Sequence, residues 1–174
     1  MRGPGRRATL YTEKPRKSWR RGGRGVTDVK GREVDVGGRR HAVDVLGGGA
    51  EPEEGGSGRK LLRITITAEV DGVRRDYTIT FGRYGAGNAA VGYATAKADA
   101  PGGREADTER LSALIKALTG REPRERRMKD GKMVVECGGE HLEGFMHYAE
   151  LADAIRRWLE EMGRRGGRRA GADR

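Results

Sequence analysis

The clearest pattern along the chain is an alternation of apolar and polar residues between Leu61 and Phe81. Nearly every second residue on each side of Asp71-Gly72 is apolar, which is typical of strands with one buried face. An Asp-Gly pair between two such runs favours a type I′ turn, because both central residues of that turn need a positive φ. The pattern therefore predicts a β-hairpin.

Helical periodicity appears in two later stretches. The first, from about 105 to 119, has apolar residues at helical spacing, namely Leu111, Leu114, Ile115 and Leu118. Gly120 suits its C-terminal cap. The second, from about 140 to 162, has an apolar stripe from Leu142 to Met162, within which Gly144 is a place for a break or bend. Both helices need a surface to cover.

Weaker patterns complete the predicted fold. Residues 124–137 predict a second hairpin that turns at 129–132, and residues 26–46 show the weak alternation of a short hairpin. Residues 89–98 fit a third strand packed through Val91 and Tyr93, or a helix because alanine is frequent. The expected fold class is α+β, a two-layer sandwich of two antiparallel hairpins, with this strand as an option, covered by two helices in the order hairpin, helix, hairpin, helix.

Composition marks the segments outside the expected domain at 59–162. Residues 47–58 contain six glycines and predict a flexible linker, while 1–25 and 163–174 are rich in Arg and Gly and predict disorder. The formal charge of +10 lies in these two ends. They carry +8 and +4, which leaves a net charge of −2 for residues 26–162.

The basic ends favour a nucleic-acid partner, because guanidinium groups neutralise phosphates and an aromatic ring can stack on a base. The candidate contacts are Trp19, Arg20, Arg21, Arg24, Arg63, Arg74, Arg164, Arg165, Arg168 and Arg169. We therefore expect a non-enzymatic module that binds DNA or RNA with low specificity. The competing interpretation of the ends is solvated termini. The competing function is protein interaction or self-association, for which Tyr148 and Trp158 offer an exposed aromatic edge.

Two other groups of residues have a spacing that bears on chemistry. Gly85–Ala90 formally fits a G-x-G-x-x-G/A phosphate loop, but it follows an antiparallel hairpin, so a flexible interstrand loop is favoured.

Cys137, His141 and His147 lie close together in the sequence, with Glu143 four residues before His147. The two histidines do not share a helix face, and a Cys–His nucleophile lacks an orienting group. We expect a buried Cys137, an exposed Glu143–His147 pair, and no catalytic residue, metal or cofactor.

Composition also bounds the setting of the protein. No apolar run approaches the length of a membrane span, and the start lacks the apolar stretch of a signal peptide, so we expect a cytoplasmic protein without a membrane partner. The single cysteine excludes an internal disulfide. Glutamine is absent, asparagine occurs once and charged residues reach 36%, a pattern typical of heat-adapted proteins or of a GC-rich genome.

The stretches APGGREAD and AELADAIRRWLEE, together with EVDGVRRDYTITFGRY and MKDGK, resemble the Pyrobaculum repeat-protein family, second group, subgroup b. The resemblance covers about 100 residues. It implies a hyperthermophilic crenarchaeal origin and a multicopy paralogous family, and it brings no activity or catalytic residues with it. Longer members continue upstream, so the Arg- and Gly-rich start departs from the family pattern, as a truncation or a misassigned start would.

The predicted element order is also similar to most of a LAGLIDADG homing endonuclease module, which binds DNA on its sheet. That family places a motif helix with a metal-binding carboxylate before the first hairpin. Here the corresponding segment is the glycine-rich stretch 47–58, without helical periodicity. Nuclease chemistry is therefore unsupported, and only a DNA-facing sheet remains as an analogy.

Overall fold

The computed structural model describes residues 24–85 and 87–172, except the side chains of residues 57 and 163–172. Its strands form one antiparallel sheet in the order β1-β2-β3-β4-β5-β7-β6. The strands are β1 (Arg32–Val36), β2 (Arg39–Glu54), β3 (Lys60–Val70), β4 (Val73–Tyr84), β5 (Ala89–Thr95), β6 (Arg124–Arg127) and β7 (Met133–Cys137). The helices are α2 (Gly103–Thr119), α3 (Gly139–Phe145) and α4 (Ala149–Ala172), with 3₁₀ turns η1 (Val26–Asp28) and η2 (Gly56–Gly58).

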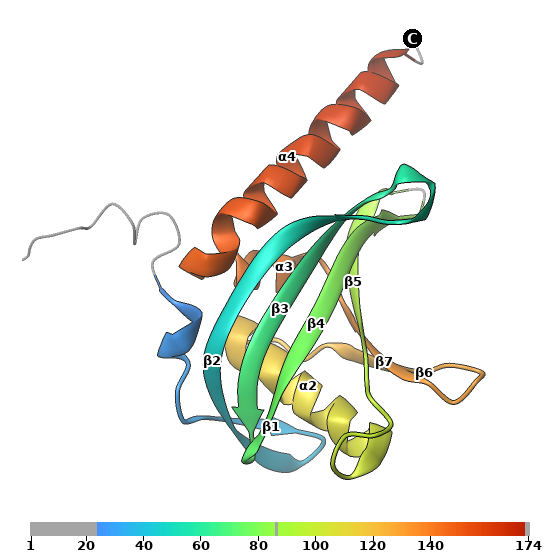
Figure 1. The fold of residues 1–174 in the computed structure, drawn as a ribbon. Coiled ribbons are helices and arrows are strands. Elements are labelled where there is room, and N and C mark those ends of the chain that lie inside the picture. Colours follow the sequence, from blue (N-terminus) through green and yellow to red (C-terminus); the bar gives the residue numbers. More distant parts are fainter. Residues whose placement is uncertain (1–23, 86, 173–174) are drawn as a thin grey trace, which may run out of the picture.

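The predicted two-layer sandwich of two hairpins under two helices is wrong. One curled sheet, shaped like half a barrel, contains all seven strands, and Figure 1 shows it wrapping around α2. The two expected hairpins are joined within this sheet because β5 pairs with β7. β2, β3 and β4 hold 16, 11 and 12 residues, and the twist that accumulates over such long strands curls a sheet. The likeness to a LAGLIDADG module therefore fails as well.

The predicted flexible linker at 47–58 is also wrong, because β2 runs through most of it. The strand pairs with β3 from Gly47 opposite Thr67 to Glu54 opposite Lys60. Glycine has a packing role in this stretch, since a Cβ on Gly48 would lie only 2.8 Å from the Ile66 side chain. The folded body therefore begins well before residue 59, and a fragment starting there would lack β1 and β2.

The hairpin around Asp71-Gly72 joins β3 to β4. Asp71 and Gly72 have φ values of 52° and 83°, as a type I′ turn requires. The apolar residues of the alternation are buried on the concave face: Leu62, Ile64, Ile66, Ala68, Val70, Tyr77, Ile79 and Phe81. β1 and β2 pair around Gly37-Gly38, within the stretch where the weaker alternation predicts a hairpin.

Residues 89–95 form a strand rather than a helix, but the packing residues predicted for it are wrong. Gly92 and Ala94 face the core, whereas Val91 and Tyr93 are half-buried on the other side. Gly92 takes the inner position because the Phe81 ring lies there, and a Cβ on Gly92 would be 2.8 Å from ring carbons. Gly92, which has no side chain, therefore determines which residues of β5 point toward the core.

α2 buries its predicted apolar stripe on the concave face of the sheet. Gly120, at φ 81°, donates its N–H to Lys116 O and ends the helix as predicted. β6 and β7 form the predicted second hairpin, in which Met133 and Val135 are buried. Met128 lies in the turn and is 45% exposed.

The single helix predicted over 140–162 is two helices, because the chain leaves the helical path between Phe145 and Ala149. The break follows Gly144, which packs against α2. A Cβ on Gly144 would lie 2.7 Å from the Thr119 Cβ. This close approach fixes where α3 ends, and the chain then turns into α4.

The predicted exposed aromatic edge at Tyr148 and Trp158 is wrong. Both side chains belong to the core, with exposures of 0% and 3%. The Tyr148 hydroxyl donates to Leu118 O at 2.6 Å, and the Trp158 indole N–H donates to Lys60 O at 3.2 Å. Large rings are readily buried when their polar atoms find such partners.

The predicted disordered tail at 163–174 is helical as far as Ala172. Arginine and alanine are good helix formers, and cations near a helix C-terminus interact favourably with its dipole. The apolar stripe of α4 ends at Met162, because the next positions on that face are Gly166 and Arg169. The sequence of the last turns therefore offers no large apolar residue, and Figure 1 shows these turns extending beyond the strands.

Most of the predicted disordered N-terminal segment, residues 1–23, lies outside the described residues. Gly25 leads into η1, and Val26 and Val29 are buried beside β2. The Val45 N–H donates to Val29 O at 2.8 Å, which ties this segment to the sheet. Of the helices described, none is long and apolar enough to cross a membrane.

Candidate functional site

Four predicted nucleic-acid-binding residues lie on the last turns of α4: Arg164, Arg165, Arg168 and Arg169. Because each residue advances an α-helix by about 100°, these four positions fall within an arc of about 140°. Residues 163–172 contain no acidic residue. The fold therefore brings the four positions to one side of a helix that continues past the sheet.

Arg63 and Arg74 lie on the convex face of the sheet. Arg63 forms an ion pair with Glu51, and its Nε is 3.7 Å from Glu53 Oε1. Arg74 stands opposite Glu69 in the β3–β4 register. Arg63 stands opposite Thr80, which lies six residues along β4 from Arg74. The two arginines are therefore about 20 Å apart along the strands. The sheet does not bring these two arginines together, and each has an acidic neighbour.

The remaining predicted contacts are at the N-terminus. Trp19, Arg20 and Arg21 lie outside the described residues. The Arg24 guanidinium is 5.3 Å from the centroid of the Tyr148 ring, and the Arg24 carbonyl accepts a hydrogen bond from the Ala149 N–H at 2.7 Å. Arg24 is therefore fixed at the start of α4.

Cys137 and His141 have separate surroundings. Cys137 is fully buried, and burial raises the pKa of its thiol to about 12, so the reactive thiolate is scarce at neutral pH. His141 Nδ1 accepts a hydrogen bond from the Gly138 N–H at 3.0 Å, at the start of α3. Glu143 is exposed. Within 24–85 and 87–172, no group of three His, Cys, Asp or Glu side chains is placed to hold a metal ion.

The Gly85–Ala90 segment begins between β4 and β5 and ends within β5. Tyr84 pairs with Ala89 in antiparallel register, so a strand follows where a phosphate loop would open a helix. Asn88 has a φ of 55° and donates its N–H to Gly85 O at 3.0 Å. This geometry is that of a turn between strands.

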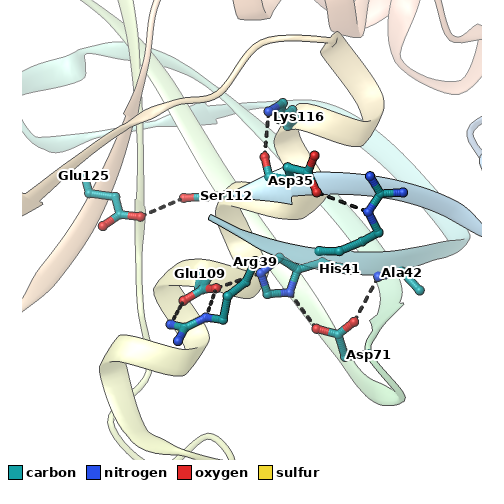
Figure 2. A network of polar contacts seen from close by, with 10 residues as sticks. Asp35, Arg39, His41, Ala42, Asp71, Glu109, Ser112, Lys116 and Glu125 are labelled. Atoms are coloured by element: carbon teal, nitrogen blue, oxygen red, sulfur yellow. Dashed lines mark hydrogen bonds and ion pairs between the residues drawn. The ribbon is translucent and has the colours of Figure 1, made fainter. Parts of the chain in front are cut away.

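A polar network lies where β2, the β3–β4 turn and α2 meet (Figure 2). His41 Nδ1 is 2.6 Å from Asp71 Oδ2, and His41 Nε2 is 2.7 Å from Glu109 Oε2. The ring donates both hydrogen bonds only when each nitrogen carries a proton. Arg39 donates to both Glu109 oxygens, at 2.8 and 2.6 Å, and the Ala42 N–H donates to Asp71 Oδ1 at 2.9 Å.

These contacts determine the charge of the two carboxylates. The hydrogen bond from Arg39 lowers the pKa of Glu109 to about 2, and His41 acts in the same direction against burial. Burial acts to raise the pKa of Asp71, but hydrogen bonds from the Ala42 N–H and from His41 outweigh it and lower the pKa. His41 therefore links three elements through two ionised carboxylates, with both ring nitrogens engaged.

A second charged cluster lies beside this network and is fully paired. Asp107 of α2 has no exposed surface, and Arg75 donates to both of its oxygens at 2.7 Å. The Lys97 N–H donates to Asp107 Oδ2 at 2.8 Å, and the Arg75 guanidinium lies 4.3 Å from the Tyr77 ring centroid. Both carboxylate oxygens have close donors, so we read this cluster as structural.

Arg110, three residues farther along α2, has fewer partners. The residue is 8% exposed, and its Nη2 donates to Pro101 O at 2.6 Å. Its Nε is buried without a hydrogen-bond partner, and Asp107 Oδ1 is 3.7 Å from Nη2. Arg110, His41 and Ala106 line a cavity of about 350 Å³ at the N-terminal end of α2.

Sequence reasoning missed this cavity, although the pattern contained a signal. Polar residues occupy positions in the buried phase of otherwise apolar elements. His41 shares the inward face of β2 with Val43. Arg75 occupies an inward position of β4, two residues before Tyr77, and Arg110 lies four residues before Leu114. Charged residues in a buried phase need partners, so such interruptions indicate polar clusters.

Comparisons with protein-family models, with curated proteins and with solved structures found no match to this chain. The resemblance to the Pyrobaculum repeat-protein family therefore stays a prediction.

Proposed function

We propose that the chain is a low-specificity nucleic-acid-binding module whose main phosphate contact is the end of α4. The observation that supports this most is the clustering of Arg164, Arg165, Arg168 and Arg169 on one side of a helix that continues past the sheet. Arginine suits this role because its planar guanidinium pairs with phosphate oxygens through two hydrogen bonds. The role requires binding alone, and we assign no catalytic step.

The dimensions of this helix end suit a nucleic-acid backbone. Residues 163–172 span about 15 Å, and a duplex carries one negative charge per about 1.7 Å of its axis. Four arginines on one side of the helix therefore have several phosphates within reach. In this proposal Trp19, Arg20 and Arg21 add further charge and a ring that stacks on bases.

The body of the protein serves in this proposal as the support for α4. Residues 26–162 carry a net charge of −2, so the body has no excess of positive charge to attract a polyanion. Arginines on its surface, such as Arg63, Arg40 and Arg126, have carboxylate partners. We also place the module in the cytoplasm of a heat-adapted organism, as composition and the family resemblance suggest.

The proposal is tested by measuring the affinity of the full chain for a fluorescent DNA duplex and a single-stranded RNA at low salt. Replacing Arg164, Arg165, Arg168 and Arg169 by Ala should weaken binding by about 100-fold, because four phosphate contacts are lost. Alanine keeps the helix propensity high, so α4 is not broken by the change.

The matched control replaces Arg40, Arg63, Arg74 and Arg126 by Ala, which changes the net charge equally. We expect this variant to bind within about threefold of the parent, since weak surface pairs are all that it loses. Equal weakening of both variants would mean that overall charge, or the sheet arginines, governs binding. If the unaltered chain binds neither probe, or self-associates independently of salt, the nucleic-acid proposal fails and an interaction module replaces it.

A further inference from the structure

Two tyrosines lie side by side on the convex face of the sheet, near the end where β4 turns into β5. Tyr84 is the last residue of β4, and Tyr93 of β5 stands opposite Thr80. The two ring centroids are 5.8 Å apart, and the ring planes cross at 76°. Both residues are half-buried, so part of each side chain is open to solvent.

Gly82 makes room for the Tyr84 ring on the sheet. The preceding Phe81 is buried in the core, so position 82 points to the convex face. A Cβ on Gly82 would be 3.0 Å from the Tyr84 hydroxyl oxygen and 3.0 Å from the Leu61 side chain. The Tyr84 side chain therefore covers Gly82 on the convex side, beside a half-buried leucine.

Arg59, the residue before β3, completes this surface. Its guanidinium carbon is 4.3 Å from the centroid of the Tyr84 ring, and its Nη2 donates to Arg83 O at 3.0 Å. Within the described part of the chain these partners are a ring and a carbonyl rather than a carboxylate, and Arg59 is exposed. Because Tyr84 covers one face of the planar guanidinium, a flat ring can stack on the other face. We call Arg59, Tyr84 and Tyr93 the aromatic platform.

The aromatic platform lies at the same end of the sheet as the arginines of α4. Trp158 of α4 donates its indole N–H to the carbonyl of Lys60, the residue after Arg59, and Lys60 Nζ is 3.6 Å from Glu161 Oε2. Arg164 follows Glu161 by three residues, or about 4.5 Å along the helix axis. Figure 1 shows α4 leaving the sheet at the end where β2 and β3 meet. A strand held by the arginines of α4 can therefore continue over the rim of the sheet onto the platform.

We propose that the aromatic platform stacks an unpaired base of a single-stranded nucleic acid whose phosphates lie on the end of α4. This inference rests on the proposed function and names its substrate class. In a duplex, neighbouring bases cover each other's faces and the grooves expose base edges alone. An unpaired base can stack on a tyrosine ring or on a guanidinium plane, and every base has such a face, so the contact does not depend on sequence.

The platform contributes stacking rather than charge. Glu136 of β7 stands opposite Tyr93, and Arg126 is its ion-pair partner at 2.9 Å. Arg59 is therefore not part of a strongly positive patch on the sheet. The attraction for phosphates comes from α4, and the platform adds affinity only where a base is unpaired.

The test measures the affinity of the full-length protein at low salt for three DNA probes, each about 12 nucleotides long. They are a single-stranded oligothymidine, the same sugar-phosphate strand without bases, and a duplex. The oligothymidine should bind about tenfold more tightly than the strand without bases, because one stacked base adds to the same phosphate contacts. Equal affinity for these two strands overturns the proposal.

Replacing Tyr84 and Tyr93 together by Leu removes both rings and keeps an apolar cover over Gly82. This variant should bind the oligothymidine about tenfold more weakly than the parent does, and the other two probes equally well, which also shows that it is folded. Arg59→Lys keeps the charge but loses the plane, and should weaken oligothymidine binding severalfold. Arg74→Lys, the same change elsewhere on the convex face, is the control and should have no effect.

The outcomes separate the aromatic platform from the arginines of α4. Unchanged oligothymidine binding in the leucine variant, or a loss shared by all three probes, overturns the platform and leaves the role of α4 standing. Equal binding by the two lysine variants would remove Arg59 from the platform. Alanine at Arg164, Arg165, Arg168 and Arg169 should weaken all three probes and keep the advantage of the strand with bases. If that variant binds every probe as the parent does, the role of α4 fails while the platform stands. If the parent binds no probe, both proposals fail.

Discussion

The body of this protein and the end of α4 use the same residue type in opposite ways. In the body, many arginines pair with carboxylates, from the buried Arg75–Asp107 pair to the exposed Arg63–Glu51 pair, and others, such as Arg32, donate to backbone carbonyls. Over residues 163–172, four arginines occur with no acidic residue. Paired arginines hold strands and helices together, whereas our proposal gives the run of arginines without acids to a polyanion. The location of charge is thus more informative than the total of +10.

We expect the largest effect on stability at the buried Arg75–Asp107 pair. Asp107→Ala removes the two hydrogen bonds that Arg75 donates to this carboxylate and the acceptor of the Lys97 N–H. It leaves a largely buried guanidinium without a carboxylate partner, with the Asp76 carbonyl as its remaining acceptor. Breaking such a pair costs about 3–5 kcal/mol, to be measured as the free energy of unfolding in urea. Asp153→Ala, at an exposed acid paired with Arg156, is the control and should change it little. A loss below about 1 kcal/mol for Asp107→Ala would contradict the structural role of the cluster.

Acid should weaken the network around His41 in a defined window. The pKa of Glu109 is about 2 in the folded chain and lies near its ordinary value of 4.5 in the unfolded chain. Because the folded pKa is the lower one, the stabilisation is complete above about pH 4.5 and is lost as pH falls towards 2. The shift sets an upper bound of about 3 kcal/mol, and the effect should be smaller because the Arg39 side chain is 73% exposed and solvent screens the pair.

The measurement compares urea unfolding of the parent and of Glu109→Gln between pH 7 and pH 2. The parent should be the more stable at pH 7, and the difference between the two proteins should shrink as pH falls through the window. A difference that stays constant with pH would show that the charge of Glu109 is unimportant to the fold.

We expect the smallest effect on stability at the exposed Arg63–Glu51 pair. Arg63→Ala removes an ion pair whose two side chains are 41% and 60% exposed, so the free energy of unfolding should change by at most about 0.5 kcal/mol. A double-mutant cycle with Glu51→Ala gives the coupling energy directly. A coupling energy above about 1.5 kcal/mol would mean that this exposed pair stabilises the fold as strongly as a buried pair does, which contradicts the expectation.

Local pattern predicted the elements of the fold better than their arrangement. The alternation around Asp71-Gly72 and the stripe of α2 depend on neighbours in sequence, and both match the structure. The curl of the sheet depends on strand length, and the glycines of 47–54 concealed the second half of β2. Glycine composition suggested flexibility there, but long-range pairing with β3 decides the conformation.

The candidate sites divide in the same way. The arginines near the C-terminus were visible as a charge cluster, but their sequence did not indicate that Gly163, Gly166 and Gly167 would lie within a helix. The cavity beside Arg110 joins β2, the β3–β4 turn and α2, which are far apart in sequence. Interruptions of the apolar pattern, such as Arg75, indicate that buried charge exists, but they do not identify its partner.

The salt dependence of DNA binding tests the contrast between the two sets of arginines most directly. The slope of the logarithm of the binding constant against the logarithm of salt concentration counts the phosphates neutralised, at about 0.9 each. Alanine at Arg164, Arg165, Arg168 and Arg169 should flatten this slope by about 3.6, while alanine at Arg40, Arg63, Arg74 and Arg126 should leave it unchanged. A slope that changes equally in the two variants, or in neither, would contradict the assignment of phosphate binding to the end of α4.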